Sequence, residues 1–250
     1  MRIGAAGRLI LACQRGRAID ISDKNRARTV KRLQNLISGL NENDQPAIEA
    51  LLTGATMVRL PASQYVFRSG DACRALLIFL SGTARVQLAS SKGRQVTLYR
   101  IVAGGSCLVT TFCLLNDSCY PAEAIAESEI EAIAVPLQNL HAAIELSPRF
   151  RQHVFGSFSL TLLEVIARTE QLAFTSVDAR LSSALLALHA KGKSNVTHQA
   201  LAVELGTARE VVSRRLKSFE SQGWVQLQRG RVIVSDQFGL QSAQDSPANS

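Results

Sequence analysis

The sequence predicts an α+β chain in which a β-sandwich or β-barrel precedes one long helix and a C-terminal helix-turn-helix domain. The first indication is a glycine spacing of eleven or twelve residues, at Gly70, Gly82, Gly93 and Gly104, with strand-like segments between the glycines. Evenly spaced short strands are typical of sandwiches and barrels. After Ser147 the apolar residues instead recur every three or four positions, which is a helical period. Two short helical patterns and a hairpin pattern follow.

Composition limits the class of protein. The chain has 250 residues, of which 46% are hydrophobic and 19% charged, so it can bury a core and is not a disordered chain. No apolar run approaches the roughly 18 residues of a membrane span, so no membrane partner is expected. Five cysteines are an odd and sparse number for this length, which indicates free thiols in a reducing cytoplasm rather than a secreted disulfide framework.

The positive charge is concentrated at the N-terminus. The net charge is +8, and a basic globular protein often binds an anionic polymer. Residues 1–32 alone contain nine lysines and arginines against two aspartates, a net charge of +7. We therefore predict a basic, poorly ordered tail over residues 1–32. Arg8 interrupts the apolar run that most resembles a signal peptide, so export is not expected.

Residues 33–146 are predicted to form the β-rich domain. The segment opens with helical spacing over residues 33–60. Residues 75–80 are a continuous apolar run, as in a strand that is buried on both faces. Apolar and polar residues alternate over residues 84–88, and further strand patterns extend to Pro136. Short strands in this order favour a jelly roll.

One helix of about 25 residues is predicted over residues 147–175. Its apolar residues follow a 3-4-3-4-3 spacing, which forms a continuous stripe as in a coiled coil. A long helix between two domains favours homodimerisation over a place in the core of one chain. The predicted interface consists of Phe155, Phe158, Leu162, Val165, Thr169 and Leu172.

Residues 176–238 are predicted to form a winged helix-turn-helix domain. Thr175, with Asp178 three residues later, resembles a capping box that starts a helix over residues 177–188. The polar residues 239–250 are predicted to be a disordered tail.

The helix-turn-helix pattern begins at Thr197, which is expected to cap its first helix. Gly206 allows a tight turn, and Thr207 is expected to cap the second helix, residues 208–222. One side of that helix is apolar and forms a core: Val212, Leu216 and Phe219. The other side is polar and basic, as in a helix that enters a DNA groove: Arg209, Glu210, Ser213, Arg214 and Lys217.

A β-hairpin follows the second helix. Strand patterns at residues 224–227 and 231–234 flank Gln228-Arg229-Gly230. The hairpin predicts a wing that carries Arg229 and Arg231.

The order of a β-roll, a long helix and a winged helix containing Thr-Ala-Arg-Glu-Val-Val-Ser-Arg-Arg-Leu-Lys resembles the CRP/FNR family of bacterial transcription regulators. The resemblance covers about residues 33–238 and implies a cyclic-nucleotide-binding-like jelly roll, a dimerisation helix and a DNA-binding winged helix. It also implies contact with RNA polymerase. The Glu-x-x-Ser-Arg group of the FNR branch falls on Glu210, Ser213 and Arg214.

These residues suit a DNA-reading role. Arginine pairs with guanine O6 and N7, and glutamate accepts from cytosine N4. An ordinary salt bridge between Glu210 and Arg214 is the alternative interpretation. We expect a palindrome of TTGA- or TGA-like half-sites about one helical turn apart. Lys217, Arg229 and Arg231 are expected to contact phosphate, and Thr207 completes the expected contact set.

The effector site departs from the family pattern. In the cyclic-AMP-binding members, a Gly-Glu pair and an Arg-Ser/Thr-Ala group hold the ribose and the phosphate. Here Thr110 stands near the Glu position, and Tyr120 and Pro121 stand at the Arg and Ser/Thr positions. A buried phosphate would lack its cation, so cyclic AMP is not expected as the effector.

Sulfur is the candidate replacement. Cys107, Cys113 and Cys119 are six residues apart, and Cys73 lies earlier in the roll. Cys113 is expected in the first turn of a short helix, where the thiol pKa would be lowered. We therefore predict a thiol switch that uses Cys107 and Cys113, with Cys119 as a further partner. The alternative is that the cysteines are structural and the regulator responds to an unidentified small ligand.

The sequence gives little support for a metal site or for enzymatic activity. Only Cys13 precedes the β-roll, where an iron–sulfur cluster of the FNR type would need several cysteines. No histidine precedes His141, which argues against haem, and no paired zinc motif is present. The sequence shows no convergent nucleophile or acid–base group, so an enzyme is not expected.

Overall fold

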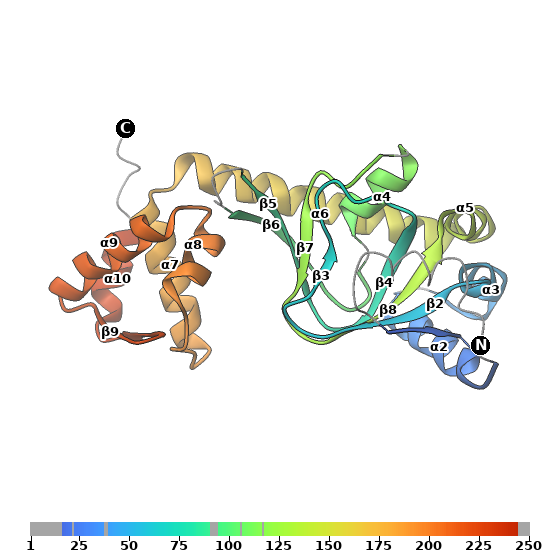
Figure 1. The fold of residues 1–250 in the computed structure, drawn as a ribbon, viewed down its shortest axis with the longest axis horizontal. Helices are drawn as coiled ribbons and strands as arrows, with labels where there is room; N and C mark the ends of the chain where they lie inside the picture. The colour runs from blue at the N-terminus through green and yellow to red at the C-terminus, as the bar shows by residue number, and fades with distance from the viewer. Residues whose placement is uncertain are drawn as a thin grey trace. The chain divides into compact units, whose positions relative to one another are not determined.

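The computed structural model describes residues 17–21, 23–37, 40–90, 95–105, 107–116 and 118–244. The chain divides into two compact units (Figure 1). The first consists of the described parts of Met1–Gln87 and Tyr99–Glu164, and the second of those of Leu88–Leu98 and Val165–Ser250.

Two four-stranded sheets form the frame of the first unit (Figure 1). The first sheet has the order β1-β2-β8-β4, with antiparallel pairs of β1 (Arg17–Asp20), β2 (Thr56–Leu60), β8 (Ile130–Pro136) and β4 (Ala75–Ser81). The second has the order β3-β7-β5-β6, with β3 (Tyr65–Phe67), β7 (Glu123–Ala126), β5 (Ala84–Ala89) and β6 (Gln95–Ile101). The predicted class, a β-sandwich followed by a long helix and a helix-turn-helix, is confirmed.

Strand β4 is buried on both faces, as its continuous apolar run predicts. Leu76 and Ile78 belong to a core cluster with helix residues such as Ile48 and Leu140, whereas Phe79, which is also buried, lies outside that cluster. The helices concerned are α3 (Gln45–Leu52) and α5 (Leu137–Leu146). Helix α4 (Leu108–Leu115) follows the second sheet's last strand.

From residue 17 onward the structure differs from the predicted tail over residues 1–32, and residues 1–16 lie outside the described residues. Arg17–Asp20 forms β1, paired with β2, and Asp23–Leu36 forms helix α2. Thr29 and Leu33 are buried on one side of α2, whereas Arg28 and Lys31 are exposed. Helix α2 is therefore amphipathic, and its many charged residues made the apolar face hard to recognise in the sequence.

The helical reading of residues 33–60 is correct only in part. Helix α2 ends at Leu36, α3 covers Gln45–Leu52, and Thr56–Leu60 is strand β2. Burial in β2 alternates, with Val58 and Leu60 inside and Arg59 exposed. A strand of five residues with alternating apolar and polar positions is too short to be told apart, by sequence, from the helical pattern that precedes it.

A buried polar cluster fixes the start of the long helix α6 (Pro148–Phe174). The Ser147 hydroxyl donates to Asp44 Oδ1 at 2.6 Å and accepts from the Phe150 amide at 2.9 Å. Asp44 Oδ2 also accepts from the Asn41 amide, in a capping box at the 3₁₀ turn Glu42–Asp44. The Ser147 and Asn41 hydrogen bonds hold the pKa of Asp44 below its ordinary value of 3.8.

We expect Asp44→Ala to lower the free energy of unfolding by about 1–3 kcal/mol, because Ser147 would stay buried without its acceptor. A lowered folded-state pKa stabilises the fold above the unfolded-state pKa, and this contribution is lost as the pH falls through the folded-state pKa. Urea unfolding at pH 7 and pH 3 should therefore show a smaller difference between wild type and variant at pH 3. Glu42→Ala, an exposed change in the same turn, should cost under about 0.5 kcal/mol. An equal difference at both pH values would contradict this role.

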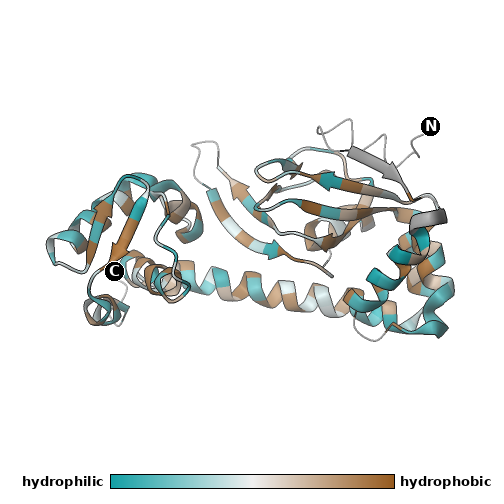
Figure 2. Cartoon of the chain, turned by 90° about the horizontal axis from the view of Figure 1, so that it is seen from below, coloured by the Kyte–Doolittle hydropathy of each residue, from teal (hydrophilic) through white to brown (hydrophobic). Residues whose placement is uncertain are grey.

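Helix α6 is a single helix of 27 residues in which hydrophobic and hydrophilic residues alternate (Figure 2). One side is buried or half-buried and includes Val165 and Leu172, two residues of the predicted stripe. The exposed side carries Phe155, Leu162 and Ile166, at 59%, 44% and 54% exposure. The 3-4 spacing fits two stripes that share positions 155, 162 and 169. Of the positions that only the predicted stripe contains, Val165 and Leu172 are half-buried, whereas Phe158 is 36% exposed. The exposed stripe is Phe155, Ser159, Leu162, Ile166, Thr169 and Ala173.

The second unit is a helical domain with a β-hairpin. Its helices are α7 (Val177–Ala190), α8 (His198–Leu205), α9 (Arg209–Ser221) and α10 (Gln237–Gln244), and its hairpin is β9 (Val225–Gln228) with β10 (Arg231–Val234). Ser176, rather than the predicted Thr175, caps α7 by accepting from the Ala179 amide.

The core of the second unit extends to its C-terminal helix. Leu181, Val212, Leu216 and Leu240 are fully buried in one cluster. The prediction of a disordered tail over residues 239–250 is wrong for residues 239–244, because they belong to α10, where Leu240 and Ala243 are buried. Residues 245–250 lie outside the described residues. The Trp224 indole lies 5.2 Å from the Phe219 ring, centroid to centroid, and packs on Gly239.

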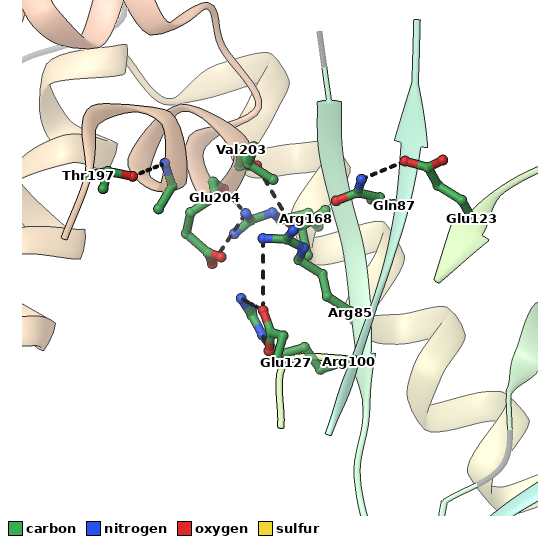
Figure 3. A network of polar contacts seen from close by, with 11 residues as sticks. Arg85, Gln87, Arg100, Glu123, Glu127, Arg168, Thr197, Val203 and Glu204 are labelled. Carbon is green, nitrogen blue, oxygen red and sulfur yellow. Dashed lines mark hydrogen bonds and ion pairs between the residues drawn. The ribbon is translucent and has the colours of Figure 1, made fainter. Parts of the chain in front are cut away.

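Charged and polar contacts brace each unit separately (Figure 3). In the first, Glu127 accepts from Arg100 at 2.8 Å and lies 3.9 Å from Arg85, which ties the second sheet to its β7–β8 connection. In the second, Arg168 of α6 pairs with Glu204 of α8 at 3.4 Å. Among the helices of the described residues, none has the length and apolarity that a bilayer crossing requires.

Candidate nucleic-acid interface and sensor site

The helix-turn-helix is built from α8, a tight turn and α9. Thr197 caps α8 as predicted, its hydroxyl accepting from the Ala200 amide at 3.1 Å (Figure 3). Gly206 ends α8 with a φ of +63°, the left-handed conformation that suits glycine. A Cβ at Gly206 would lie 2.8 Å from Leu172 Cδ2. The turn therefore requires glycine for its backbone and for its packing.

Helix α9 has the two faces that the sequence predicts. Val212, Leu216 and Phe219 are buried against the rest of the domain. Its N-cap is Ala208, with no side-chain cap, so the expected capping role of Thr207 is wrong. On the opposite face four charged side chains are exposed and Ser213 is half-buried: Arg209, Glu210, Arg214 and Lys217.

Glu210 and Arg214 are available to a partner. In the part of the chain that the structure describes, no ion pair joins them, so the alternative of an intrahelical salt bridge has no support. Arg215, next to Arg214, instead points to the first turn of α7, where its Nε lies 3.2 Å from Asp178 Oδ1. Adjacent arginines thus have different surroundings, because 100° of helix separates them.

The wing is held against α9 and the loop before α8. The Leu227 amide of β9 donates to Glu220 Oε1 of α9 at 2.9 Å. Arg231 Nε, on β10, donates to Asn195 Oδ1 at 2.5 Å, and this hydrogen bond holds the Arg231 side chain against the loop before α8. Arg229 is exposed in the turn. Both arginines follow from the hairpin pattern, whereas the supporting residues Glu220 and Asn195 belong to no motif in the sequence.

One contact at this surface joins the two helices of the motif. His198 Nδ1, at the start of α8, lies 2.8 Å from Ser213 Oγ in the middle of α9. Both side chains are half-buried. No sequence motif indicates this contact, since residues fifteen apart give no local signal.

The roll interior brings together the positions where cyclic-AMP-binding relatives are expected to hold ribose and phosphate. Tyr120 Oη lies 3.2 Å from Thr110 Oγ1, and the Cys73 thiol donates to Tyr120 Oη at 3.1 Å. The Tyr120 ring stacks on Phe67, with centroids 3.9 Å apart. Two neutral hydroxyls and a thiol thus satisfy one another where a phosphate would need a cation.

A second tyrosine–cysteine contact lies beside the first. Tyr99 Oη is 3.3 Å from Cys107 Sγ and accepts from the Val109 amide at 3.1 Å. Cys107 is the N-cap of α4, and its sulfur accepts from the Thr110 amide at 3.4 Å. Burial raises the pKa of the Cys107 thiol and raises the pKa of Cys73 to about 11.

The predicted reactive position of Cys113 is wrong. Cys113 is the sixth residue of α4, not in its first turn, and it is fully buried. Burial raises the pKa of its thiol instead of lowering it. Among the four cysteines that the structure describes, Cys119 is the exposed one, and the Cys113 thiol lies 3.4 Å from the Cys119 carbonyl oxygen. Among the described residues, no three histidine, cysteine or carboxylate side chains gather as metal ligands would.

Comparisons with known proteins match both units. The Crp-like helix-turn-helix domain matches residues 179–243, and the cyclic nucleotide-binding domain matches residues 57–147. The chain is 25% identical over 210 residues to the CRP-like cAMP-activated global transcriptional regulator of Mycobacterium tuberculosis, covering 80% of this chain and 93% of that protein. It is 28% identical over 179 residues to the cyclic AMP receptor protein of Thermus thermophilus, covering 70% and 82%.

Solved structures agree with the sequence comparisons. A structure from Eubacterium rectale assigned to the CRP/FNR family superposes with a TM-score of 0.72 and 25% identity, covering 86% of this chain and 99% of that one. The c-di-GMP responsive regulator CLP of Xanthomonas campestris has the same fold, with a TM-score of 0.66, 23% identity and coverage of 76% and 98%. With the roll and the helix-turn-helix domain both matched, this chain belongs to the CRP/FNR family of transcriptional regulators.

Proposed function

We propose that this regulator binds a palindromic DNA site as a homodimer and that thiol chemistry in its β-roll controls the binding. The observation that carries the DNA-reading part is the exposed face of α9, where Arg209, Glu210, Arg214 and Lys217 stand opposite a fully buried apolar face. A helix of this kind places its N-terminal residues at base edges in the major groove. Localisation in the cytoplasm and contact with RNA polymerase complete the proposal.

Each side chain has a proposed role. Arg214 pairs with guanine, Glu210 accepts from cytosine N4, and Ser213 contacts a third base. Lys217 and the wing arginines Arg229 and Arg231 contact phosphate, which strengthens binding without selecting sequence. Arg209 and Thr207 are the remaining residues proposed to contact the DNA. The half-site is TTGA- or TGA-like, repeated about one helical turn away.

The exposed stripe of α6 is the proposed dimer interface. Phe155, Leu162 and Ile166 share one side with Leu163, which is 61% exposed. Large apolar side chains this exposed on one helix face mark an interaction surface. A second copy suits it, because a twofold axis beside α6 would pair each stripe with itself and place two recognition helices on a palindrome.

The sequence predicts a switch between Cys107 and Cys113, with Cys119 as a further partner. Because Cys119 is exposed and the Cys113 thiol contacts its carbonyl oxygen, the proposed pair is instead Cys113 and Cys119, with the buried Cys107 as the third candidate. Hydrogen peroxide would transfer one oxygen to the exposed Cys119 thiol, giving a sulfenic acid, and its other oxygen would leave as water. The Cys113 thiol would then attack the Cys119 sulfur, form the disulfide and release a second water. Two thiols lose two electrons and two protons in all. Such a bond would draw the end of α4 toward the loop that carries Tyr120, and so disturb the Tyr120–Thr110–Cys73 contacts.

A second candidate is a regulator that responds to an unidentified small ligand. The burial and raised thiol pKa values of Cys107 and Cys113 favour it, because thiolates are the reactive species. In this alternative the cysteines only pack the roll.

The test is binding of a fluorescent TTGA-palindrome duplex at fixed salt by reduced protein and by protein treated with peroxide or with inorganic polysulfide. We expect the affinity to change about tenfold or more on treatment, with a Cys113–Cys119 linkage in the peptide mass spectrum. Cys119→Ser should abolish the change and Cys107→Ser should keep it. Tight binding that never changes, without any cysteine linkage, would retire the switch in favour of the ligand. Absence of specific binding would contradict the proposed operator.

A further inference from the structure

The contact between His198 and Ser213 places an imidazole behind a hydroxyl of the reading face. His198 Nδ1 and Ser213 Oγ are 2.8 Å apart, within the range of a strong hydrogen bond. Ser213 lies between the exposed Arg209 and Lys217 positions, four residues from each. Through this hydrogen bond, α8 contacts the polar side of α9.

This contact restricts what Ser213 can recognise. A serine hydroxyl has one proton to donate and two lone pairs that accept. If His198 Nδ1 is unprotonated, the hydroxyl donates to it, and Ser213 can only accept, as from adenine N6 or cytosine N4. If Nδ1 carries a proton, it donates to Oγ and leaves the hydroxyl proton for guanine O6 or N7 or thymine O4. In the first case the hydroxyl can no longer rotate to suit any base, and in the second case one lone pair is occupied, so its proton is directed away from His198.

We infer that His198 is a positioning residue for DNA specificity, which fixes the direction of the Ser213 hydrogen bond and so selects the base at one half-site position. The inference rests on the proposed reading of DNA by α9. It assigns a role in discrimination to a side chain outside the recognition helix.

The test is selection of duplexes from a pool with randomised half-sites, using the full-length wild type and four variants. Ser213→Ala and His198→Ala are expected to lose preference at the same single position, by about five- to tenfold in relative enrichment, and to keep the preferences set by Arg214 and Glu210. His198→Asn should restore the preference, because an asparagine amide atom occupies the place of Nδ1. His198→Gln is the matched control, because its amide lies one bond farther out and should behave like His198→Ala.

The outcomes separate the two proposals. If the wild type enriches no sequence, DNA reading by α9 fails and the inference fails with it. If the wild type enriches a palindrome but His198→Ala keeps its profile, or weakens binding equally at all positions, the inference alone is overturned. The same holds if Ser213→Ala keeps the wild-type profile. Circular dichroism should show the same helix content in all five proteins.

Discussion

Replacing Arg214 by alanine is expected to weaken binding to the palindromic duplex by at least about 30-fold. A bidentate arginine–guanine contact contributes about 1–3 kcal/mol of discrimination, and a dimer on a palindrome makes the contact twice. Binding to unrelated duplex should fall much less, because phosphate contacts supply it. Fluorescence anisotropy at one salt concentration, with specific and scrambled duplexes, measures both values.

Arg215→Ala provides the matched control for Arg214→Ala. Both changes remove one arginine from α9, but Arg215 is paired with Asp178 of α7. Its loss should cost under about 1 kcal/mol of stability, as for an exposed ion pair, and change specific binding less than about twofold. Equal effects of the two substitutions would show that only total charge matters, which would contradict base reading by Arg214.

Ile166→Glu is expected to convert the dimer to monomer. The substitution occurs twice across a twofold interface, so two carboxylates of like charge would be buried beside one another without partners. We expect a cost of about 4 kcal/mol or more, which is a thousandfold rise in the dimer dissociation constant. Sedimentation equilibrium over a range of protein concentrations measures this constant, and palindrome binding should weaken in parallel.

Leu160→Glu is the corresponding control. Leu160 is 71% exposed on α6 but lies about 140° around the helix from Phe155. We expect this variant to remain dimeric. A dimeric Ile166→Glu protein with wild-type helix content would place the interface elsewhere.

The sequence predicted best where one segment carries its own pattern. The apolar run of β4, the Thr197 cap, the Gly206 turn and the buried face of α9 follow from neighbouring residues, and the structure has them all. Caps one residue from the expected position, Ser176 and Ala208, show the limit of such local signals.

What the sequence did not reveal depends on contacts between distant residues. The amphipathic character of α2 was hidden by charge, and the exposed stripe of α6 could be chosen only once its buried side was known. The contact of the Cys113 thiol with the Cys119 carbonyl depends on how the loop after α4 folds back, and the His198–Ser213 contact depends on how α8 crosses α9. Each of these features is set by tertiary packing, which overrides the local propensity of the residues involved.

Trp224 gives this protein a built-in optical reporter. It is the single tryptophan of the chain and packs between Phe219 of α9 and Gly239 of α10. Intrinsic tryptophan emission therefore reports on the winged helix alone, while Tyr65, Tyr99 and Tyr120, the three tyrosines of the chain, all lie in the roll. Melting followed at the two chromophores would show whether the two units unfold together or in sequence, without any label.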